Sequence, residues 1–199
     1  MSSTAKLIQI PCLVTGRRTL LRSAGTIGLS AAVVALIGGR ETMAAGMSAS
    51  DSDVQTLNVA LGLENEAINA YQLGAESGLL TPDVIKVAVL FQSQHKEHRD
   101  ALIATIRKLG GRPVEEQSMA TYAKALNAAS LKSQKDVLEL AAKLEMGATN
   151  AYLGVIPGFN DKDLAQVAGR IAADETMHWT VLASALGWPL PRKALSFGA

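Results

Sequence analysis

The sequence has 199 residues, of which 48% are hydrophobic, 19% charged and only 4% aromatic, a composition that favours a folded helical protein and argues against an all-β fold or a disordered chain. A lone cysteine, Cys12, excludes a disulfide framework, a cysteine-based zinc site and an iron–sulfur cluster held by this chain alone. The net charge of +1 hides an asymmetry, because residues 1–44 hold five basic residues and one acidic residue whereas residues 45–199 hold 14 basic and 17 acidic residues, so no nucleic-acid partner is expected.

Residues 1–45 have the order of an export signal. The segment GRRTLLR at residues 16–22 precedes a mild apolar stretch over residues 24–38, and small residues follow where a signal peptidase can cut. As a helix this stretch spans about 22 Å, which is shorter than a hydrocarbon core of ~30 Å. The pair Arg17-Arg18 resembles a twin-arginine signal, which implies the twin-arginine (Tat) export machinery as a partner and a periplasmic location. An uncleaved signal that anchors the protein to the inner membrane is the alternative.

Apolar residues recur at steps of three and four from residue 51 to residue 187, which predicts helices. The first helix is expected over residues 51–77, with Asp51 or Asp53 as its N-cap. The second is expected to begin at Thr81-Pro82 and to end at the glycine pair 110–111, because proline fits a first turn and glycine a helix end. These two helices form the first predicted hairpin.

A second hairpin is predicted after a connection over residues 112–132, which contains a short helix at 119–128. The third helix begins after Ser133 in a start resembling a capping box and reaches Val155; the fourth is capped by Asn160 or Asp161 and ends at Gly187. Residues 46–199 are therefore predicted to form an all-α domain, a four-helix bundle of two helical hairpins joined by a long crossover.

The two hairpins resemble each other in sequence. Residues 63–71, LENEAINAY, match residues 144–152, LEMGATNAY, at a shift of 81, and His98 matches His178 at a shift of 80. An approximate internal two-fold axis is expected from this similarity, although two alanine-rich helices can also resemble each other by chance.

Six polar residues interrupt the inward stripes of the four helices. At ~1.5 Å per residue all six lie about 18–26 Å from their hairpin turns, which places them in one layer. An unpaired buried carboxylate costs several kcal/mol, so this layer requires compensating positive charge. The six residues are Glu64, His95, His98, Glu145, Glu175 and His178.

A metal ion is the compensation that this residue set predicts. Residues three apart share a helix face, so His95 with His98 and Glu175 with His178 each offer two ligands to one centre. Three carboxylates and three imidazoles form an oxygen and nitrogen cage suited to iron, manganese, zinc or copper. The alternative is that each histidine is a core residue satisfied by a neighbour's hydrogen bond.

Other polar residues near this layer receive different predictions. Tyr71 and Tyr152 lie two turns beyond Glu64 and Glu145, and each is expected to pack in the core with its hydroxyl bonded to a ligand carboxylate, with a redox relay as the alternative. Trp188 is expected to seal the end of the bundle. Four further acidic residues fall off the stripes and are predicted to face solvent: Glu66, Glu76, Glu97 and Glu139.

The predicted first and third helices each carry a glutamate, and the fourth carries Glu-x-x-His. This pattern resembles that of the ferritin-like superfamily, and more narrowly that of its exported bacterial members with a twin-arginine leader. The resemblance covers residues 52–187 and is strongest at Asp174-Glu175-Thr176-Met177-His178. It implies terminal carboxylates at Glu64 and Glu145, nitrogen ligands at His98 and His178, and a bridging carboxylate at Glu175.

The resemblance also implies a function. The implied function is that of an exported metal-binding protein in metal or oxidative-stress handling, with iron as the foremost metal. Whether the chain is a metal-dependent oxidase or ferroxidase stays open. A metal-free structural or stress-related bundle and a manganese-dependent peroxide-consuming enzyme remain as alternatives. The sequence leaves open whether the chain forms a homo-oligomer.

One position departs from the superfamily pattern. His95 stands where the di-iron members have a second bridging glutamate. Losing that carboxylate lowers the negative charge of the cage and favours a single ion, a softer ion or an asymmetric pair. A general-base role for His95 is also open, because imidazole titrates near neutrality.

Overall fold

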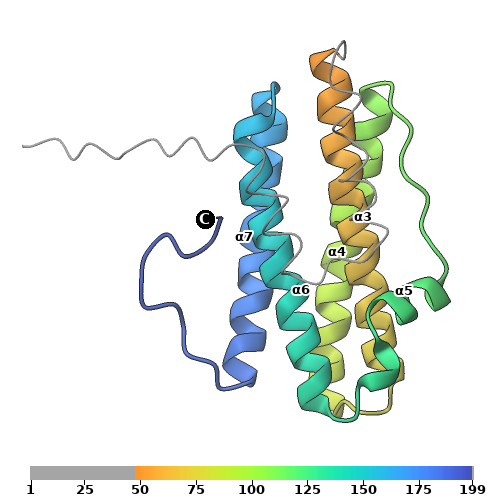
Figure 1. Cartoon of the computed structure of the whole chain (residues 1–199), viewed down its shortest axis with the longest axis vertical. Helices are drawn as coiled ribbons and strands as arrows, with labels where there is room; N and C mark the ends of the chain where they lie inside the picture. The colour runs from red at the N-terminus through yellow and green to blue at the C-terminus, as the bar shows by residue number, and fades with distance from the viewer. Residues whose placement is uncertain (1–47, 199) are drawn as a thin grey trace, which may run out of the picture.

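The computed structural model describes residues 48–198, so the predicted export signal at residues 1–45 lies outside the described residues. Within that part of the chain the fold is all-helical, with no strand, as predicted (Figure 1). The elements in chain order are α3 (Ala49–Glu76), α4 (Pro82–Lys108), α5 (Met119–Ala125), η1 (Ala128–Ser130), α6 (Gln134–Val155), η2 (Ile156–Gly158) and α7 (Lys162–Ala185).

The four long helices form two antiparallel hairpins that pack side by side. Helix α3 packs along α4 and α6 packs along α7, and α3 also contacts α6. Because α4 and α6 run in the same direction, the chain between them must return along the whole bundle, and Figure 1 shows this crossover descending beside the first hairpin to α5. The predicted bundle with one long crossover is confirmed.

The helix starts show which local signals the chain uses. Ser48, not Asp51 or Asp53, caps α3: its hydroxyl accepts from the Asp51 amide while the Asp51 carboxylate accepts from the Ser48 amide. Asp53 is instead buried and contacts the amide of Asn160 at 3.3 Å. The predicted cap was wrong because both aspartates are good caps in isolation, and only the backbone conformation at Ser48 decides among them.

The remaining boundaries agree with the predictions except at one point. The hydroxyl of Ser133 caps α6 and the carboxylate of Asp161 caps α7, whereas Thr81 precedes α4 without a side-chain cap bond. The short crossover helix ends at Ala125, before the expected residue 128, because Asn127 adopts the left-handed conformation with φ of 51°.

The apolar core is divided into two clusters by the polar layer. One cluster contains Leu61, Leu102 and Ile106, and the other contains Phe91 and Leu182 on the opposite side of the six predicted residues along the bundle. The crossover is attached to α3 by Asn58, whose side chain binds backbone groups of residues 112 and 114. The half-buried Trp188 packs against the second cluster and closes that end, as expected.

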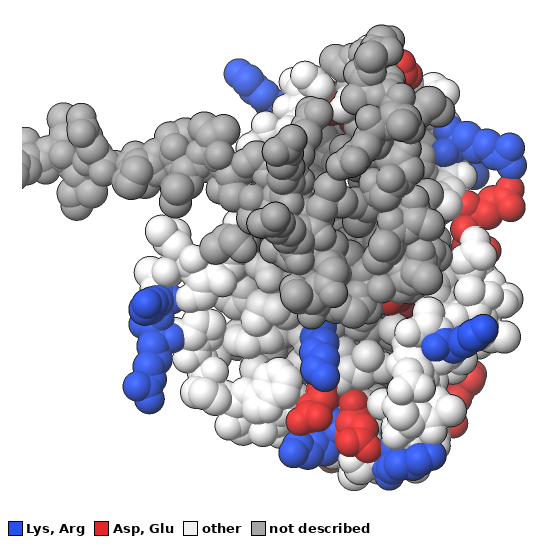
Figure 2. Space-filling view, viewed as in Figure 1, with Lys and Arg blue, Asp and Glu red and all other residues white. Residues whose placement is uncertain are grey.

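The surface is mixed in charge. Figure 2 shows lysine and arginine side chains interspersed with acidic ones over the coloured part of this face rather than gathered in one basic patch. In the described residues no helix combines the length and apolarity that a membrane crossing requires.

Candidate metal centre

The structure brings all six predicted residues together at the middle of the bundle. They form two overlapping groups that could each hold a metal ion, with one possible ligand atom per residue and with the atoms of each group within 4.8 Å of one another. Each of the six residues is at most 9% exposed. The groups share two residues and are Glu64, His95, His98, Glu175 and His95, Glu145, Glu175, His178.

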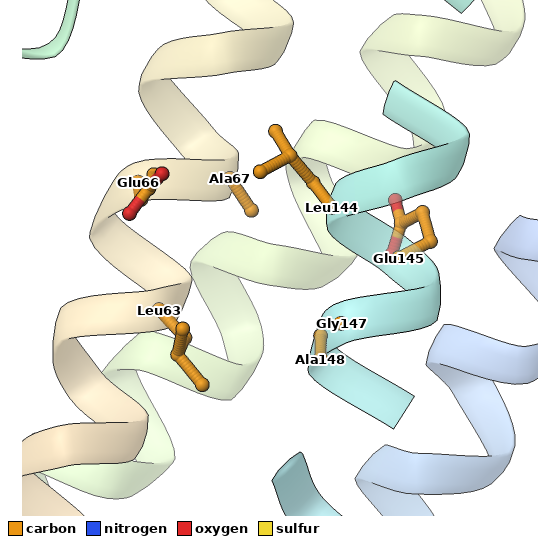
Figure 3. A pocket seen from close by; sticks show the side chains of 7 residues that line it. All are labelled: Leu63, Glu66, Ala67, Leu144, Glu145, Gly147 and Ala148. Carbon is orange, nitrogen blue, oxygen red and sulfur yellow. The ribbon is translucent and has the colours of Figure 1, made fainter. Parts of the chain in front are cut away.

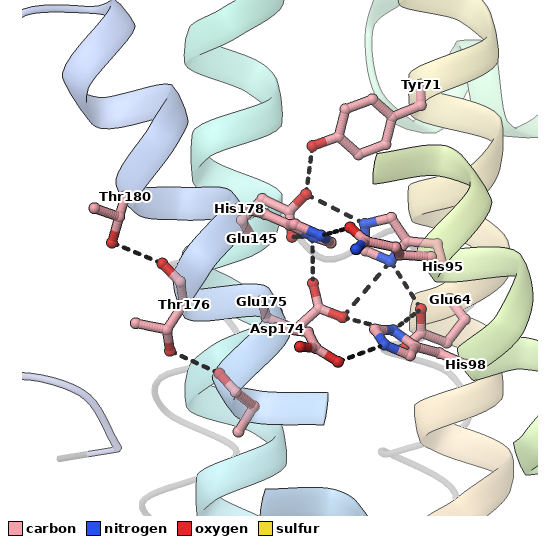
Figure 4. A network of polar contacts seen from close by, with 12 residues as sticks. Glu64, Tyr71, His95, His98, Glu145, Asp174, Glu175, Thr176, His178 and Thr180 are labelled. Atoms are coloured by element: carbon pink, nitrogen blue, oxygen red, sulfur yellow. Dashed lines mark hydrogen bonds and ion pairs between the residues drawn. The ribbon is translucent and has the colours of Figure 1, made fainter. Parts of the chain in front are cut away.

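Two histidines are held from outside the cluster by equivalent partners. Nε2 of His98 lies 3.2 Å from a carboxylate oxygen of Asp174 (Figure 4). Nε2 of His178 lies 2.7 Å from the amide oxygen of Gln94. A hydrogen on Nε2 that donates outward leaves the lone pair of Nδ1 on each ring directed inward. Outer partners of this kind fix the tautomer and orientation that a metal-ligating histidine requires.

The inward-facing atoms are short of hydrogen bonds. Nδ1 of His98, Nδ1 of His178, one oxygen of Glu145 and both oxygens of Glu175 are buried and make none. Instead, Nδ1 of His98 lies 3.2 Å from Glu175, and Nδ1 of His178 lies 3.5 Å from both Glu145 and Glu175. Such buried polar atoms are costly unless a partner completes them, and all of them are donor types for a transition metal.

His95 lies between the two halves of the cluster. Its Nδ1 is 2.8 Å from Glu64 and its Nε2 is 3.2 Å from Glu145. Its Nδ1 also lies 3.6 Å from Glu175, so His95 faces a carboxylate from each of the three other long helices. A protonated His95 can donate to Glu64 and Glu145 at once, and a neutral ring retains one nitrogen as a metal ligand.

Both predicted tyrosine contacts are present, and they are reciprocal. The Tyr71 hydroxyl on α3 donates to Glu145 on α6, and the Tyr152 hydroxyl on α6 donates to Glu64 on α3 at 2.5 Å. Each hairpin thus supplies the tyrosine that donates to the carboxylate of the other hairpin, as the internal sequence similarity leads one to expect. These tyrosines therefore orient the two carboxylates.

A model of the ferritin-like domain family matches residues 52–188. The chain belongs to the ferritin-like domain family. Among solved structures it is similar to a conserved hypothetical protein, rv2844, from Mycobacterium tuberculosis, with 22% identity, a TM-score of 0.58 and coverage of 73% of this chain and 99% of that chain. That likeness shows a shared fold alone. No curated protein matched the chain.

Within this ferritin-like domain the two hairpins place corresponding residues at the site. His98 corresponds to His178, and the outer partner Gln94 corresponds to Asp174, which differs from it in residue type. Each outer partner contacts the histidine of the other hairpin. The central pair is the chemical asymmetry, because α4 supplies His95 where α7 supplies Glu175. The site therefore has three carboxylates and three imidazoles.

Electrostatics distinguish Glu175 from the other two carboxylates. Burial raises the pKa of Glu64, but contacts with His95 and His98 outweigh burial and lower its pKa to about 2. Burial followed by the charge of Glu64 raises the pKa of Glu175 to about 7. Burial lowers the pKa of His98, but contacts with Glu175 and Glu64 outweigh it and raise its pKa to about 10. Without a metal, the histidines supply the positive charge.

These shifts predict how the metal-free protein responds to pH. A raised His98 pKa stabilises the fold below 6.5, and this contribution is lost as pH rises towards about 10. The stabilisation from protonated Glu175 is lost as pH rises from 4.5 to about 7. The stabilisation from ionised Glu64 is lost in the other direction, as pH falls from 4.5 to about 2. Urea unfolding with a chelator should therefore show maximal stability near pH 4.5, a first decrease as Glu175 ionises, and a further decrease of more than about 2 kcal/mol between pH 6.5 and pH 9 as His98 begins to lose its proton. Equal stability at pH 6 and pH 9 would contradict this assignment of charge.

The tyrosine contacts predict a second effect on stability. Tyr152 is 2% exposed, so Tyr152→Phe leaves a carboxylate oxygen of Glu64 without its donor in the core and should lower the free energy of unfolding by about 1–3 kcal/mol. Tyr122→Phe is the matched control, because the Tyr122 hydroxyl accepts from the amide of an exposed residue, Gln117, which water can satisfy. Chemical denaturation of the two variants measures the difference, and an equal loss in both would contradict the proposed contact.

One sequence prediction next to the site was wrong. Glu66 was expected to face solvent, but it is 1% exposed on α3. The crossover covers this side of α3, and its Glu116 binds the neighbouring Asn69 at 2.7 Å. Helical periodicity places Glu66 outside the bundle, and it cannot anticipate burial by a distant loop. Glu76 and Glu97 are exposed, as predicted, and Glu139 is half-exposed and pairs with Lys135.

Sequence reasoning also gave no role to Gln94 and Asp174. Each directly precedes the central residue of its helix, at positions 95 and 175. The shift of 80 that relates the histidines also relates these two residues, so the internal repeat carries the signal that could have identified them.

A small cavity lies between α3 and α6 beside the cluster. Its volume is about 20 Å³, which is enough for one water molecule. Figure 3 shows the small residues Ala67, Gly147 and Ala148 around it, with Glu145 of the cluster also in its lining.

Proposed function

We propose that this ferritin-like domain binds a transition-metal ion at the centre of its bundle and acts in metal or oxidative-stress handling. Iron is the foremost candidate, and manganese, zinc and copper share the ligand chemistry. The proposed ligands are the six converging residues, Glu64, His95, His98, Glu145, Glu175 and His178.

The observation that carries this proposal is the orientation of the terminal histidines. Both rings are held at Nε2 by a residue outside the cluster, and both direct an Nδ1 without a hydrogen bond towards buried carboxylate oxygens. A core that only needed to neutralise charge would satisfy these atoms with one another. The arrangement of outer partner, histidine and inward lone pair instead supports ligation of an ion.

The donor set limits the number and kind of ion. With His95 in place of a carboxylate, three glutamates supply at most three negative charges to the two overlapping groups. This charge supports one divalent ion or an asymmetric pair better than two equivalent ions. A redox-active ion bound here would supply one-electron chemistry with oxygen or peroxide. The chain's own contribution is to stabilise the higher metal charge with carboxylates and to exclude bulk water through the two core clusters.

Metal analysis tests the proposal. The protein is purified without a histidine tag, stripped with a chelator, reconstituted separately with Fe²⁺, Mn²⁺, Zn²⁺ and Cu²⁺, and analysed by inductively coupled plasma mass spectrometry. Stoichiometric retention of at least one metal is expected, together with its loss in His98→Ala. Substoichiometric binding of every metal after reconstitution would overturn the proposal.

The second candidate is a metal-free structural bundle. Its specific support is His95, which contacts Glu64 and Glu145 through its two ring nitrogens in the manner of a buried ion pair. In that case reconstitution fails with every metal, and the three histidines remain protonated at neutral pH. Nitrogen-15 chemical shifts of the histidine rings separate the two candidates, because metal ligation requires a deprotonated ring nitrogen.

We also propose that the protein is exported to the periplasm through the twin-arginine route. The support is the order of Arg17-Arg18, the apolar stretch and the small residues that follow it. Cell fractionation tests the proposal: Arg17→Lys with Arg18→Lys should retain the protein in the cytoplasm. Mass analysis of the exported form distinguishes a cleaved signal from an uncleaved anchor.

A further inference from the structure

A second cavity lies at the end of the bundle that holds the turn between α3 and α4, next to the candidate metal centre but separate from it. It has a volume of about 250 Å³ and is lined by all four long helices and the crossover. Nearly all of its lining is aliphatic or aromatic, and Asp83 is the charged residue among the lining side chains. Water would find too few hydrogen-bond partners on such walls, whereas an apolar molecule would gain contacts on all sides.

The cavity has a closed side and an open side. Leu126 of the crossover is 7% exposed and closes it over the gap between α3 and α6. On the opposite side Val87 is 37% exposed and Val181 is 42% exposed, and Ala185 is also exposed, although all three line the cavity. The opening therefore lies between the start of α4 and the end of α7.

Two aromatic residues that line the cavity also contact residues of the candidate metal centre. Phe91 lines the cavity and stacks on His178 with ring centroids 4.1 Å apart. Tyr71 lines it as well and donates its hydroxyl to Glu145. A molecule that fills the cavity therefore reaches the two aromatic side chains that separate it from the buried Glu/His cluster.

We propose that this cavity binds an uncharged, apolar small molecule with one end against Phe91 and Tyr71. A cavity of about 150 Å³ holds benzene, so by proportion about 250 Å³ holds about ten carbon atoms. A negatively charged head group is disfavoured, because Asp83 stands at the opening and its neighbour Lys86 already pairs with it at 2.9 Å. The inference goes beyond the proposed function, since binding depends on the cavity walls and not on a metal.

The first test compares neutral and charged probes of equal chain length. Calorimetric titration of the metal-free protein should show saturable binding of 1-decanol, with decanoate bound at least about tenfold more weakly. Bound decanol should also raise the melting temperature, because the ligand binds the folded state alone. Equal affinity for the two probes, or no saturable binding of decanol, would overturn the proposal.

Variants locate the binding site. Ala141→Phe fills the cavity from α6, and Ala185→Trp blocks the opening from an exposed position whose replacement leaves the core unchanged. Each should weaken decanol binding at least about tenfold. Ala104→Trp is the matched control at an exposed position of α4 outside the lining, and its affinity should equal that of the unaltered protein. Unchanged affinity in Ala185→Trp would show that decanol binds elsewhere, and a dimer that dissociates on adding decanol would show that a second copy occupies the opening.

The orientation of the bound molecule has its own readout. The chain has three histidines, so their ring resonances report separately on the shared wall. Decanol should shift the resonances of His178, which stacks on Phe91, more than those of His98, which lies about two helical turns from Phe91 along α4. No shift of His178 would overturn the contact with the wall. Because this experiment uses metal-free protein, its failure is distinguishable from a failure of the proposed metal site.

Discussion

Glu175→Gln should abolish transition-metal binding and leave the metal-free bundle folded. Glu175 belongs to both possible ligand groups, is fully buried and has two oxygens without hydrogen bonds. Loss of an outer partner of a metal ligand typically costs about 10–100-fold in affinity, so loss of a ligand common to both groups should cost more. Calorimetric titration of Fe²⁺ under anaerobic conditions, and of Zn²⁺, measures this effect.

The same variant separates the metal site from a purely structural ion-pair cluster. Burial and the charge of Glu64 raise the pKa of Glu175 to about 7, so an ionised Glu175 opposes folding above that pH. Glutamine removes the charge at nearly constant shape, and the metal-free variant should be at least as stable as the unaltered protein at pH 8. The matched control is Glu97→Gln, an exposed glutamate on α4. Loss of folding in Glu175→Gln without metal would instead assign this carboxylate a structural role.

His95→Glu should make folding depend on metal. The replacement removes the two contacts of His95 with Glu64 and Glu145 and places a fourth carboxylate in a buried layer. Breaking a buried charged pair costs about 3–5 kcal/mol, so the variant should be destabilised by at least that amount in a chelator. Fe²⁺ or Mn²⁺ should restore its stability, because an ion that binds only the folded state shifts the unfolding equilibrium.

Metal stoichiometry is the second readout of His95→Glu. The variant carries glutamate and histidine three residues apart on both α4 and α7, the arrangement that the ferritin-like resemblance associates with a pair of ions. It should therefore retain more metal per chain than the unaltered protein. Ser93→Glu adds the same charge at an exposed position on α4 and should change neither stability nor metal content. If metal content stays the same while stability recovers, His95 does not determine how many ions the site holds.

The sequence by itself determined the helices and the members of the polar layer. Apolar residues at helical spacing define four long segments, and proline and glycine at their ends limit where each can begin and stop. Glu64 and Glu145 interrupt these stripes at matching positions of the internal repeat, and helix geometry converts sequence separation into height along the bundle. One-dimensional information is sufficient for this step because rise and twist per residue are nearly constant.

Only the tertiary structure decided which side chains meet across helices. Tyr71 bonds the carboxylate of the facing hairpin, and Gln94 and Asp174 each hold a histidine of the other hairpin. Burial of Glu66 under the crossover likewise depends on a loop distant in sequence. The apolar cavity beside Phe91 exists because four helices and that loop leave space between their walls. These features depend on the packing distance and rotation of whole helices, which no periodicity along a single helix encodes.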